Sequence, residues 1–159
     1  MKLNDPVRSS EIEAPVMPFH ISYVEPFWEA QSSVGELVGL FVGGAVSIDR
    51  MLRKDGVSYW RNETFNFNYP EIKRCDILIT HSAPTWNGPI DKSAMLTNFC
   101  ERDLTLWDEC MSERKQHDIL IKLSGAKRHY CGHFHQLSIV DFDGCVSTIL
   151  DELQIAEIS

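Results

Sequence analysis

Hydrophobic and polar positions divide this chain into an irregular opening and an ordered remainder. Residues 1–33 contain four of the seven prolines and show neither helical nor strand periodicity. In residues 37–47, β-branched and aromatic residues end in small ones, which predicts a core strand. A second apolar run, residues 76–80, stops at His81 and predicts a buried strand that delivers this histidine into a loop. Functional residues are often found at such strand ends.

One long segment has helical periodicity. Residues 102–124 contain neither proline nor glycine, and Gly125 follows them as an expected C-cap. The large apolar residues of this segment fall near one helical face: Leu104, Trp107, Met111 and Ile121. The pattern predicts a helix that packs this face against a core.

Strand patterns return after the expected helix. Four segments alternate or cluster apolar residues: 128–131, 137–142, 146–150 and 153–158. Asp143-Gly144 between the second and third segments is typical of a hairpin turn, so we expect a terminal β-meander. Residues 49–74 mix charged and aromatic side chains around Gly56 and Pro70, which predicts a surface loop with short helical turns.

Composition and charge narrow the possible partners. A chain of 159 residues with 43% hydrophobic and 24% charged residues fits one globular domain, or a piece of a larger one, that buries roughly two thirds of its unfolded surface. Fifteen Lys and Arg residues against 23 Asp and Glu residues give a net charge of -8. This charge argues against nonspecific binding of nucleic acids and against binding to anionic membranes.

The cysteines and the apolar runs favour a soluble cytoplasmic protein. Five cysteines, with no C-x-x-C pair, fit neither a disulfide framework nor a zinc ribbon. The first 30 residues are too acidic and too rich in proline for a signal peptide. The longest apolar run, residues 37–48, is interrupted by glycines and is too short to cross the ~30 Å of a membrane's hydrocarbon core.

Three histidines carry the strongest chemical signal. His133 and His135 follow a predicted strand, with Gly132 just before them, and alternate residues of a strand point the same way. Glycine allows close approach of a ligand to the backbone, and imidazole nitrogen suits Zn, Mn or Fe. His81 ends a neighbouring strand and could lie beside them. Two interpretations stay open: a metal site, or hydrogen-bonded histidines with a structural role.

Other candidates have weaker support. His117 in the expected helix and His129 at the start of a strand fit surface or packing roles, and Cys131 fits a buried strand cysteine rather than a nucleophile. Three histidines with an open position could also form a mononuclear zinc hydrolase site like that of carbonic anhydrase. No Gly-x-x-x-x-Gly-Lys phosphate loop occurs, so an ATPase is not supported.

An ordered set of motifs resembles a known family. The set comprises Gly43-Gly44-Ala45-Val46-Ser47-Ile48-Asp49-Arg50, then Arg53, Trp60 and Glu63, then Thr80-His81-Ser82-Ala83-Pro84, and finally Gly132-His133-Phe134-His135. In order and spacing it resembles the second half of calcineurin-like metallophosphoesterases of bacterial or phage type. The match spans about residues 37–158, and the tail from Ile149 resembles the family's final strand pair.

The resemblance implies an α+β fold, part of an αββα sandwich in which mixed β-sheets are flanked by helices. Residues 37–159 would form the C-terminal half of the phosphoesterase domain, and residues 1–36 an irregular lead-in. His81 and His133 match ligands of the second metal of a two-metal centre, and His135 matches a ligand of the first.

Five further positions match the family signature around the substrate pocket. They are Asp49, Arg50, Arg53, Trp60 and Glu63. Loop-anchoring salt bridges and packing are an equally open interpretation of these five. No catalytic residue is assigned beyond the metal ligands.

The sequence departs from the family in one large respect. It contains no Asp-x-His, no Gly-Asp-x-x-Asp or Gly-Asp-x-x-Arg, and no Gly-Asn-His, the motifs that supply the bridging aspartate and the remaining ligands. We therefore expect that the N-terminal half is missing. Without a bridging carboxylate to offset the repulsion between two dications, the chain should bind at most one Mn, Fe or Zn ion, and weakly.

Two functions follow from these observations. The first is a metal-dependent phosphoesterase that hydrolyses phosphomonoesters or phosphodiesters by a metal-activated hydroxide and needs the missing half for activity. The alternative is a non-catalytic remnant or partner-binding module of the family. Half a sandwich would leave an apolar sheet face uncovered, and such a face favours association.

Overall fold

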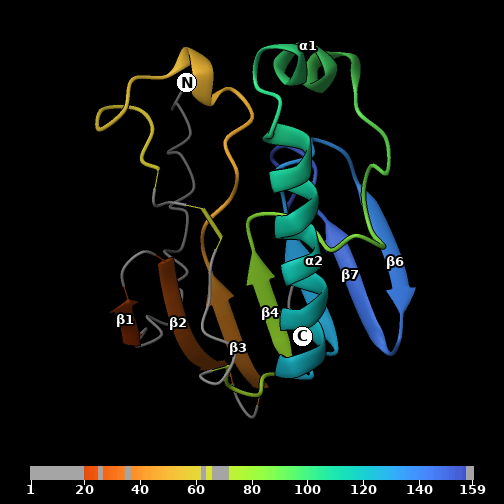
Figure 1. Cartoon of the computed structure of the whole chain (residues 1–159). Coiled ribbons are helices and arrows are strands. Elements are labelled where there is room, and N and C mark those ends of the chain that lie inside the picture. Colours follow the sequence, from red (N-terminus) through yellow and green to blue (C-terminus); the bar gives the residue numbers. More distant parts are fainter. Residues whose placement is uncertain (1–19, 25–26, 35–36, 62–63, 66–71, 157–159) are drawn as a thin grey trace, which may run out of the picture.

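A mixed β-sheet runs through the computed structural model (Figure 1). The structure describes residues 20–24, 27–34, 37–61, 64–65 and 72–156. Within them the sheet has seven strands in the order β1-β2-β3-β4-β5-β7-β6. The strands are β1 (His20–Val24), β2 (Phe27–Val34), β3 (Leu37–Val42), β4 (Ile77–Thr80), β5 (Arg128–Cys131), β6 (Ser138–Phe142) and β7 (Cys145–Ile149).

The sheet has a parallel centre and antiparallel edges. Strands β3, β4, β5 and β7 pair in parallel, whereas β1 pairs with β2, β2 with β3 and β6 with β7 in antiparallel fashion. Because parallel strands end at the same edge of a sheet, the loops that leave β3, β4 and β5 meet there. These loops carry the motifs picked out in the sequence.

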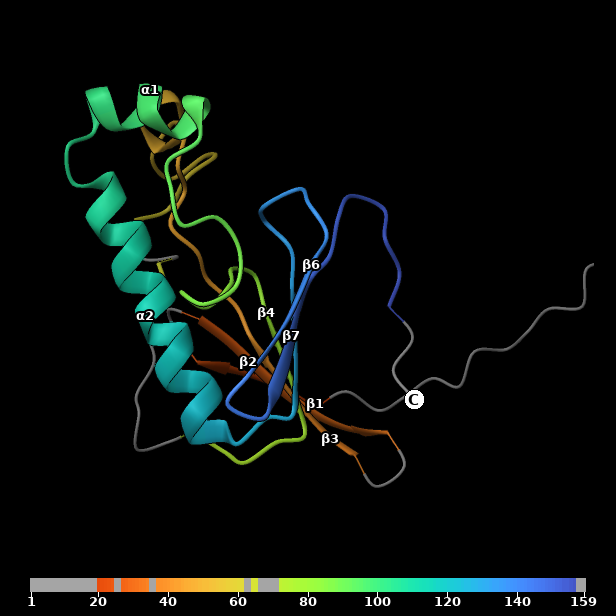
Figure 2. The same cartoon turned by 90° about the vertical axis from the view of Figure 1, so that its right-hand side faces the viewer.

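Two helices accompany the sheet. The long helix α2 (Leu106–Ser124) lies against one face, as the two views show, and the shorter α1 (Ala94–Arg102) lies beyond its N-terminal end (Figures 1 and 2). In the part of the chain that the structure describes, no helix covers the opposite face and no second sheet is present. The α+β class with a mixed sheet is thus confirmed, while a two-sheet sandwich stays a prediction.

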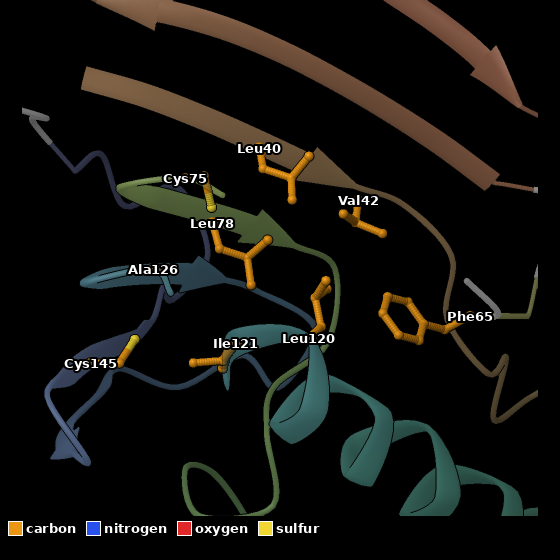
Figure 3. Packing of buried hydrophobic residues seen from close by; sticks show 9 residues of the cluster. All are labelled: Leu40, Val42, Phe65, Cys75, Leu78, Leu120, Ile121, Ala126 and Cys145. Atoms are coloured by element: carbon orange, nitrogen blue, oxygen red, sulfur yellow. The ribbon is translucent and has the colours of Figure 1, made fainter. Parts of the chain in front are cut away.

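The hydrophobic core lies between α2 and the sheet. Its buried residues come from β3, β4, β7, α2 and neighbouring loops: Leu40, Val42, Phe65, Cys75, Leu78, Leu120, Ile121, Ala126 and Cys145 (Figure 3). A smaller cluster of Ala83, Cys131 and Ile149 packs with Phe134 near the strand ends. Cys131 is therefore a buried strand cysteine, as expected, and all five thiols are free.

The helix prediction was correct in type and in its end. The Gly125 N–H donates to the Ile121 carbonyl at 3.1 Å, and Gly125 has a φ of 68°, the left-handed conformation of a glycine C-cap. The helix begins at Leu106 rather than at residue 102, so Leu104 precedes it and is 86% exposed.

The predicted buried face of this helix was correct only at Ile121. Of the seven buried residues of α2, three are apolar (Leu106, Leu120 and Ile121), three are ionisable (Glu113, Arg114 and His117), and one is Ser124. The polar members bind loops that return from distant parts of the chain. A periodicity of apolar residues does not predict the partners of these polar side chains.

Several strand predictions need correction. Residues 20–24 and 27–34 were expected to be irregular, but they form β1 and β2; β2 pairs with the edge of β3, and β1 pairs with β2. This pairing depends on neighbouring strands more than on local propensity. The core strand predicted for residues 37–47 ends at Val42, because the chain leaves the sheet at the glycine pair, where Gly44 has a φ of 98°.

The terminal meander is also different from the prediction. The hairpin at Asp143-Gly144 is present, with positive φ at both residues as in a type I′ turn. However, β5 pairs with β7 in parallel, and β6 lies outside them at the edge. Residues 153–156 form no strand, since both edges of β7 are already occupied by β5 and β6, and the rest of the predicted segment lies outside the described residues. The described helices include none long and apolar enough to cross a membrane.

Candidate functional site

Two histidines meet where neighbouring parallel strands end. His81 follows β4 and His133 follows β5 by two residues, and the Gly132 N–H donates to the His81 carbonyl at 3.3 Å. His81 Nε2 and His133 Nδ1 lie 3.0 Å apart, and the two rings meet edge to face with centroids 4.9 Å apart. The structure thus brings together two of the three predicted ligands.

The geometry of this pair suits either a hydrogen bond or a shared metal ion. Loss of water around the rings lowers the pKa of His81 and lowers that of His133 to about 4, so both imidazoles are neutral near pH 7 and each keeps a lone pair. Two nitrogens bound to one Zn²⁺ at about 2.05 Å would lie about 2.9 to 3.4 Å apart, for angles between octahedral and tetrahedral. The observed 3.0 Å falls in this range.

The backbone after β5 is held in an uncommon conformation. His133 and His135 have φ values of 72° and 50°, in the left-handed region that residues with a Cβ seldom adopt. Such conformations are often found at functional sites, where the surrounding structure maintains them. At Gly132, a Cβ atom would meet no protein atom within 4 Å, so no protein contact requires a glycine at this position.

His135 is turned to a different partner. Its Nδ1 lies 2.5 Å from Glu152 Oε1, and both side chains are about 70% exposed. Within the described ranges, no three His, Cys, Asp or Glu side chains are grouped so that they could hold a metal ion. The predicted His₃ cluster is therefore present here as a histidine pair with His135 nearby.

A cavity connects the histidines to the glycine-rich segment. Its volume is 770 Å³, within the range of small-molecule sites. The lining comes from the loop after β3, the segment that follows it, the histidine loops and α1: Gly43, Gly44, Ala45, Val46, Ser47, Ile48, Asp49, Arg53, His81, Met95, Phe99, His133 and His135. All three predicted ligands and two of the five predicted pocket residues, Asp49 and Arg53, thus share one cavity.

Two further pocket candidates, Arg50 and Trp60, do not line this cavity. Arg50, at the start of η1 (Arg50–Leu52), hydrogen-bonds Asp103 at 2.6 and 3.0 Å and also binds Glu109. These carboxylates raise the pKa of Arg50, and the cluster ties η1 to the junction of α1 and α2. Trp60 is 44% exposed and does not line the cavity. Glu63 lies outside the described residues.

A buried chain of hydrogen bonds connects the segment next to His81 to β5 and β7. Thr80 Oγ1 donates to the Ser82 carbonyl at 2.6 Å and so accepts from His129 Nε2 at 2.8 Å. His129 Nδ1 then carries the lone pair and accepts from Ser147 Oγ at 2.9 Å, and Ser147 accepts in turn from Asn87 Nδ2 at 2.8 Å. Every donor direction is fixed, so His129 is a structural histidine, in line with the packing role expected for it.

Helix α2 holds the loop that carries His81. Arg114 donates to the carbonyls of four loop residues: Pro84, Thr85, Asn87 and Pro89. Asp118 accepts from the Thr85 N–H at 2.8 Å and from its hydroxyl at 2.6 Å. The sequence did not single out these residues. The available signal was a polar row, Glu113, His117 and Ser124, at helical spacing from buried Leu106.

His117 is the second fully buried histidine. Its Nδ1 donates to the Glu113 carbonyl at 3.0 Å, and its ring stacks on Phe65 with centroids 4.0 Å apart. Its Nε2 has no hydrogen-bond partner in the described part of the chain. Burial lowers the pKa of His117 to about 4, so the ring is neutral and has the packing role that the sequence allowed.

These buried groups predict an unusual acid sensitivity. Burial lowers the pKa of His129 to about 3 and those of His117 and His133 to about 4, against 6.5 unfolded, so between pH 6.5 and 4.5 the unfolded chain binds three protons that the folded chain does not. Burial also raises the pKa of Glu113 from 4.5 to about 7, which offsets one of them. The net difference is then two protons, and we expect a net loss of about 2 to 3 kcal/mol per pH unit over this window.

Urea unfolding followed by circular dichroism at pH 6.5, 5.5 and 4.5 measures this loss. The Glu113→Gln variant removes the offset, so its slope should rise by about half. A free energy of unfolding that stays flat or rises as pH falls through this window would contradict the assignment of neutral buried histidines.

Comparisons with known proteins add no relative: no family model, curated protein or solved structure matches this chain.

Proposed function

We propose that this chain carries part of the active site of a metal-dependent phosphoesterase, which hydrolyses phosphomonoesters or phosphodiesters. The observation that supports this most is the pair of neutral imidazoles with nitrogens 3.0 Å apart at one side of a 770 Å³ cavity. Imidazole nitrogens suit Mn, Fe or Zn. His81 and His133 would hold the ion, and His135 on the same cavity is the third candidate ligand.

A bound divalent ion would supply Lewis acidity toward the phosphate oxygens and lower the pKa of a water molecule. The residues of the chain supply the surroundings. Loss of water keeps both imidazoles unprotonated, so no proton has to leave before they can act as ligands near pH 7. The strand ends fix their backbones, so little ordering is needed on binding.

Arg53 provides a positive charge at the cavity. Its Nε donates to Asp49 Oδ1 at 2.6 Å and its Nη1 to the Ser58 carbonyl at 3.2 Å. A guanidinium has five N–H donors, and these two bonds use two of them. The remaining donors suit a phosphate group, which would otherwise be repelled by a chain of net charge -8.

The alternative function is a non-catalytic, partner-binding module. It is favoured by the sheet face opposite α2, where Ile139 and Val146 are 64% and 37% exposed. Paired residues of neighbouring strands share a face, and Val146 alternates with Cys145 and Ser147, which are buried toward α2. This surface fits association, whether or not the chain also binds a metal.

Turnover separates the two functions. Hydrolysis of p-nitrophenyl phosphate and bis(p-nitrophenyl) phosphate would be measured with Mn²⁺, with and without a co-expressed polypeptide that carries the absent Asp-x-His, Gly-Asp-x-x-Asp and Gly-Asn-His motifs. We expect metal-dependent turnover only with that polypeptide, and none when His133→Ala is introduced. A stable complex of the two polypeptides without metal-dependent turnover would favour the binding module instead.

A further inference from the structure

A buried carboxylate links the two walls of the cavity. Glu113 on α2 is 5% exposed and lies between the loop after β3 and the loop after β4. Its Oε2 accepts from the Val46 N–H at 2.5 Å, and its carboxylate also accepts a hydrogen bond from the Ser82 hydroxyl. Val46 and Ser82 are themselves 5% and 2% exposed. The contacts are therefore inside the protein, away from solvent.

Each of these two partners belongs to a wall of the candidate site. Val46 lies within the glycine-rich segment that lines the cavity, and Ser82 directly follows His81. The carbonyl of Ser82 is already bound by Thr80 Oγ1, and that of His81 by the Gly132 N–H. The hydrogen bond that the Ser82 hydroxyl donates to Glu113 fixes the side chain of Ser82 as well, so the backbone around His81 is restrained from several sides.

Burying the Glu113 carboxylate costs desolvation free energy that an apolar side chain in the same place would not require. Desolvation raises its pKa to about 7, which means that burial works against its charge. A leucine would pack at this depth without that cost. A carboxylate, in contrast, can accept two hydrogen bonds at once and so join two loops that diverge from parallel strands.

We propose that Glu113 is a positioning residue: through Ser82 and Val46 it holds His81 at the distance from His133 that binds one metal ion, and holds the glycine-rich wall beside it. This inference rests on the proposed function. It assigns to α2 a part in the site that none of the recognised motifs contains.

Asp118 offers a matched control for a purely structural role. It lies on the same helix, and its carboxylate likewise accepts from one backbone N–H and one hydroxyl, both of Thr85. Thr85 is four residues beyond His81, so this contact holds the loop without touching Ser82 or the glycine-rich wall. Asp118→Ala should lower stability and leave the histidine pair unchanged.

The test is a Co²⁺ titration of the full chain, followed by absorbance and calorimetry. We expect Glu113→Ala to weaken Co²⁺ binding by about 10- to 100-fold, as is typical when an outer partner of a ligand is lost. Glu113→Gln keeps an acceptor for Val46 and should bind within about threefold of wild type. Ser82→Ala removes one of the two hydrogen bonds to Glu113 and keeps the one from Val46, so it should also weaken Co²⁺ binding. This second variant tests the proposal even if Glu113→Ala does not fold.

Imidazole NMR without any metal gives an independent readout. The ring signals of His81 should shift in Glu113→Ala and Ser82→Ala and stay unchanged in Asp118→Ala. Wild-type Co²⁺ affinity and unchanged His81 signals in both Glu113→Ala and Ser82→Ala would overturn the role of Glu113. If wild type binds no Co²⁺, the metal function fails, and the His81 signals still decide whether Glu113 positions that residue.

Discussion

Replacing Arg114 by leucine is expected to lower the free energy of unfolding by about 3 to 5 kcal/mol, the largest effect of any single change considered. The guanidinium is buried and donates to the carbonyls of Pro84, Thr85, Asn87 and Pro89. Each carbonyl left without a donor in the interior costs about 1 to 3 kcal/mol, and a shift of the loop would recover part of the sum. Urea unfolding at pH 7 measures the loss.

Two arginine variants make this prediction specific. Arg114→Lys keeps a charged donor and should lose less stability, since an ammonium can reach some of the same carbonyls. Arg61→Leu should have almost no effect, because Arg61 is 80% exposed and its pair with Asp55 is a surface salt bridge. Arg114→Leu with wild-type stability would show that α2 does not hold this loop.

Replacing His129 by leucine is expected to have the second largest effect, a loss of about 3 kcal/mol at pH 7. The ring is fully buried and joins Thr80 to Ser147, so the variant removes one hydrogen bond from each of two buried hydroxyl groups and leaves the Ser147 O–H without an acceptor. The same variant should be less sensitive to mild acid. With His129 gone, Glu113 offsets His117 and only His133 remains, so the slope between pH 6.5 and 4.5 should fall by about half.

Measuring both quantities on one variant distinguishes this account from simple loss of packing. A cavity or a misfit would lower stability by a similar amount at every pH. His135→Ala serves as the control, since His135 is 69% exposed, and it should change neither the stability nor the slope. A His129→Leu variant that is less stable yet keeps the wild-type slope would contradict the protonation states assigned to the network.

Local patterns predicted the elements that depend on local chemistry. The helix end at Gly125, the strand at residues 76–80 and the hairpin at Asp143-Gly144 follow from backbone conformation and short-range hydropathy. Local patterns did not predict the strands β1 and β2, because these strands are stabilised by pairing with their neighbours in the sheet. The helix α1 was also missed: it has only nine residues and none of them is buried, and Ser93 as its N-cap was the available signal.

The candidate site was predictable only in part. Neighbouring strand ends correctly brought His81 and His133 together. The same reasoning failed for His135, because β5 ends at Cys131 and the left-handed backbone after it no longer alternates side chains between two faces. Glu113 and Arg114 were missed because their partners lie 67 and about 30 residues away in the chain.

The central claim is that His81 and His133 together hold one divalent metal ion, and a titration of the full chain with Zn²⁺ in a calorimeter tests it most directly. We predict one ion per chain, with affinity reduced by more than about 100-fold in His81→Ala and in His133→Ala, since loss of a ligand should exceed the 10- to 100-fold effect of an outer partner. His20→Gln, in the edge strand β1, should bind as wild type does. Equal affinity in wild type and both alanine variants, or no binding to any of them, would contradict the claim.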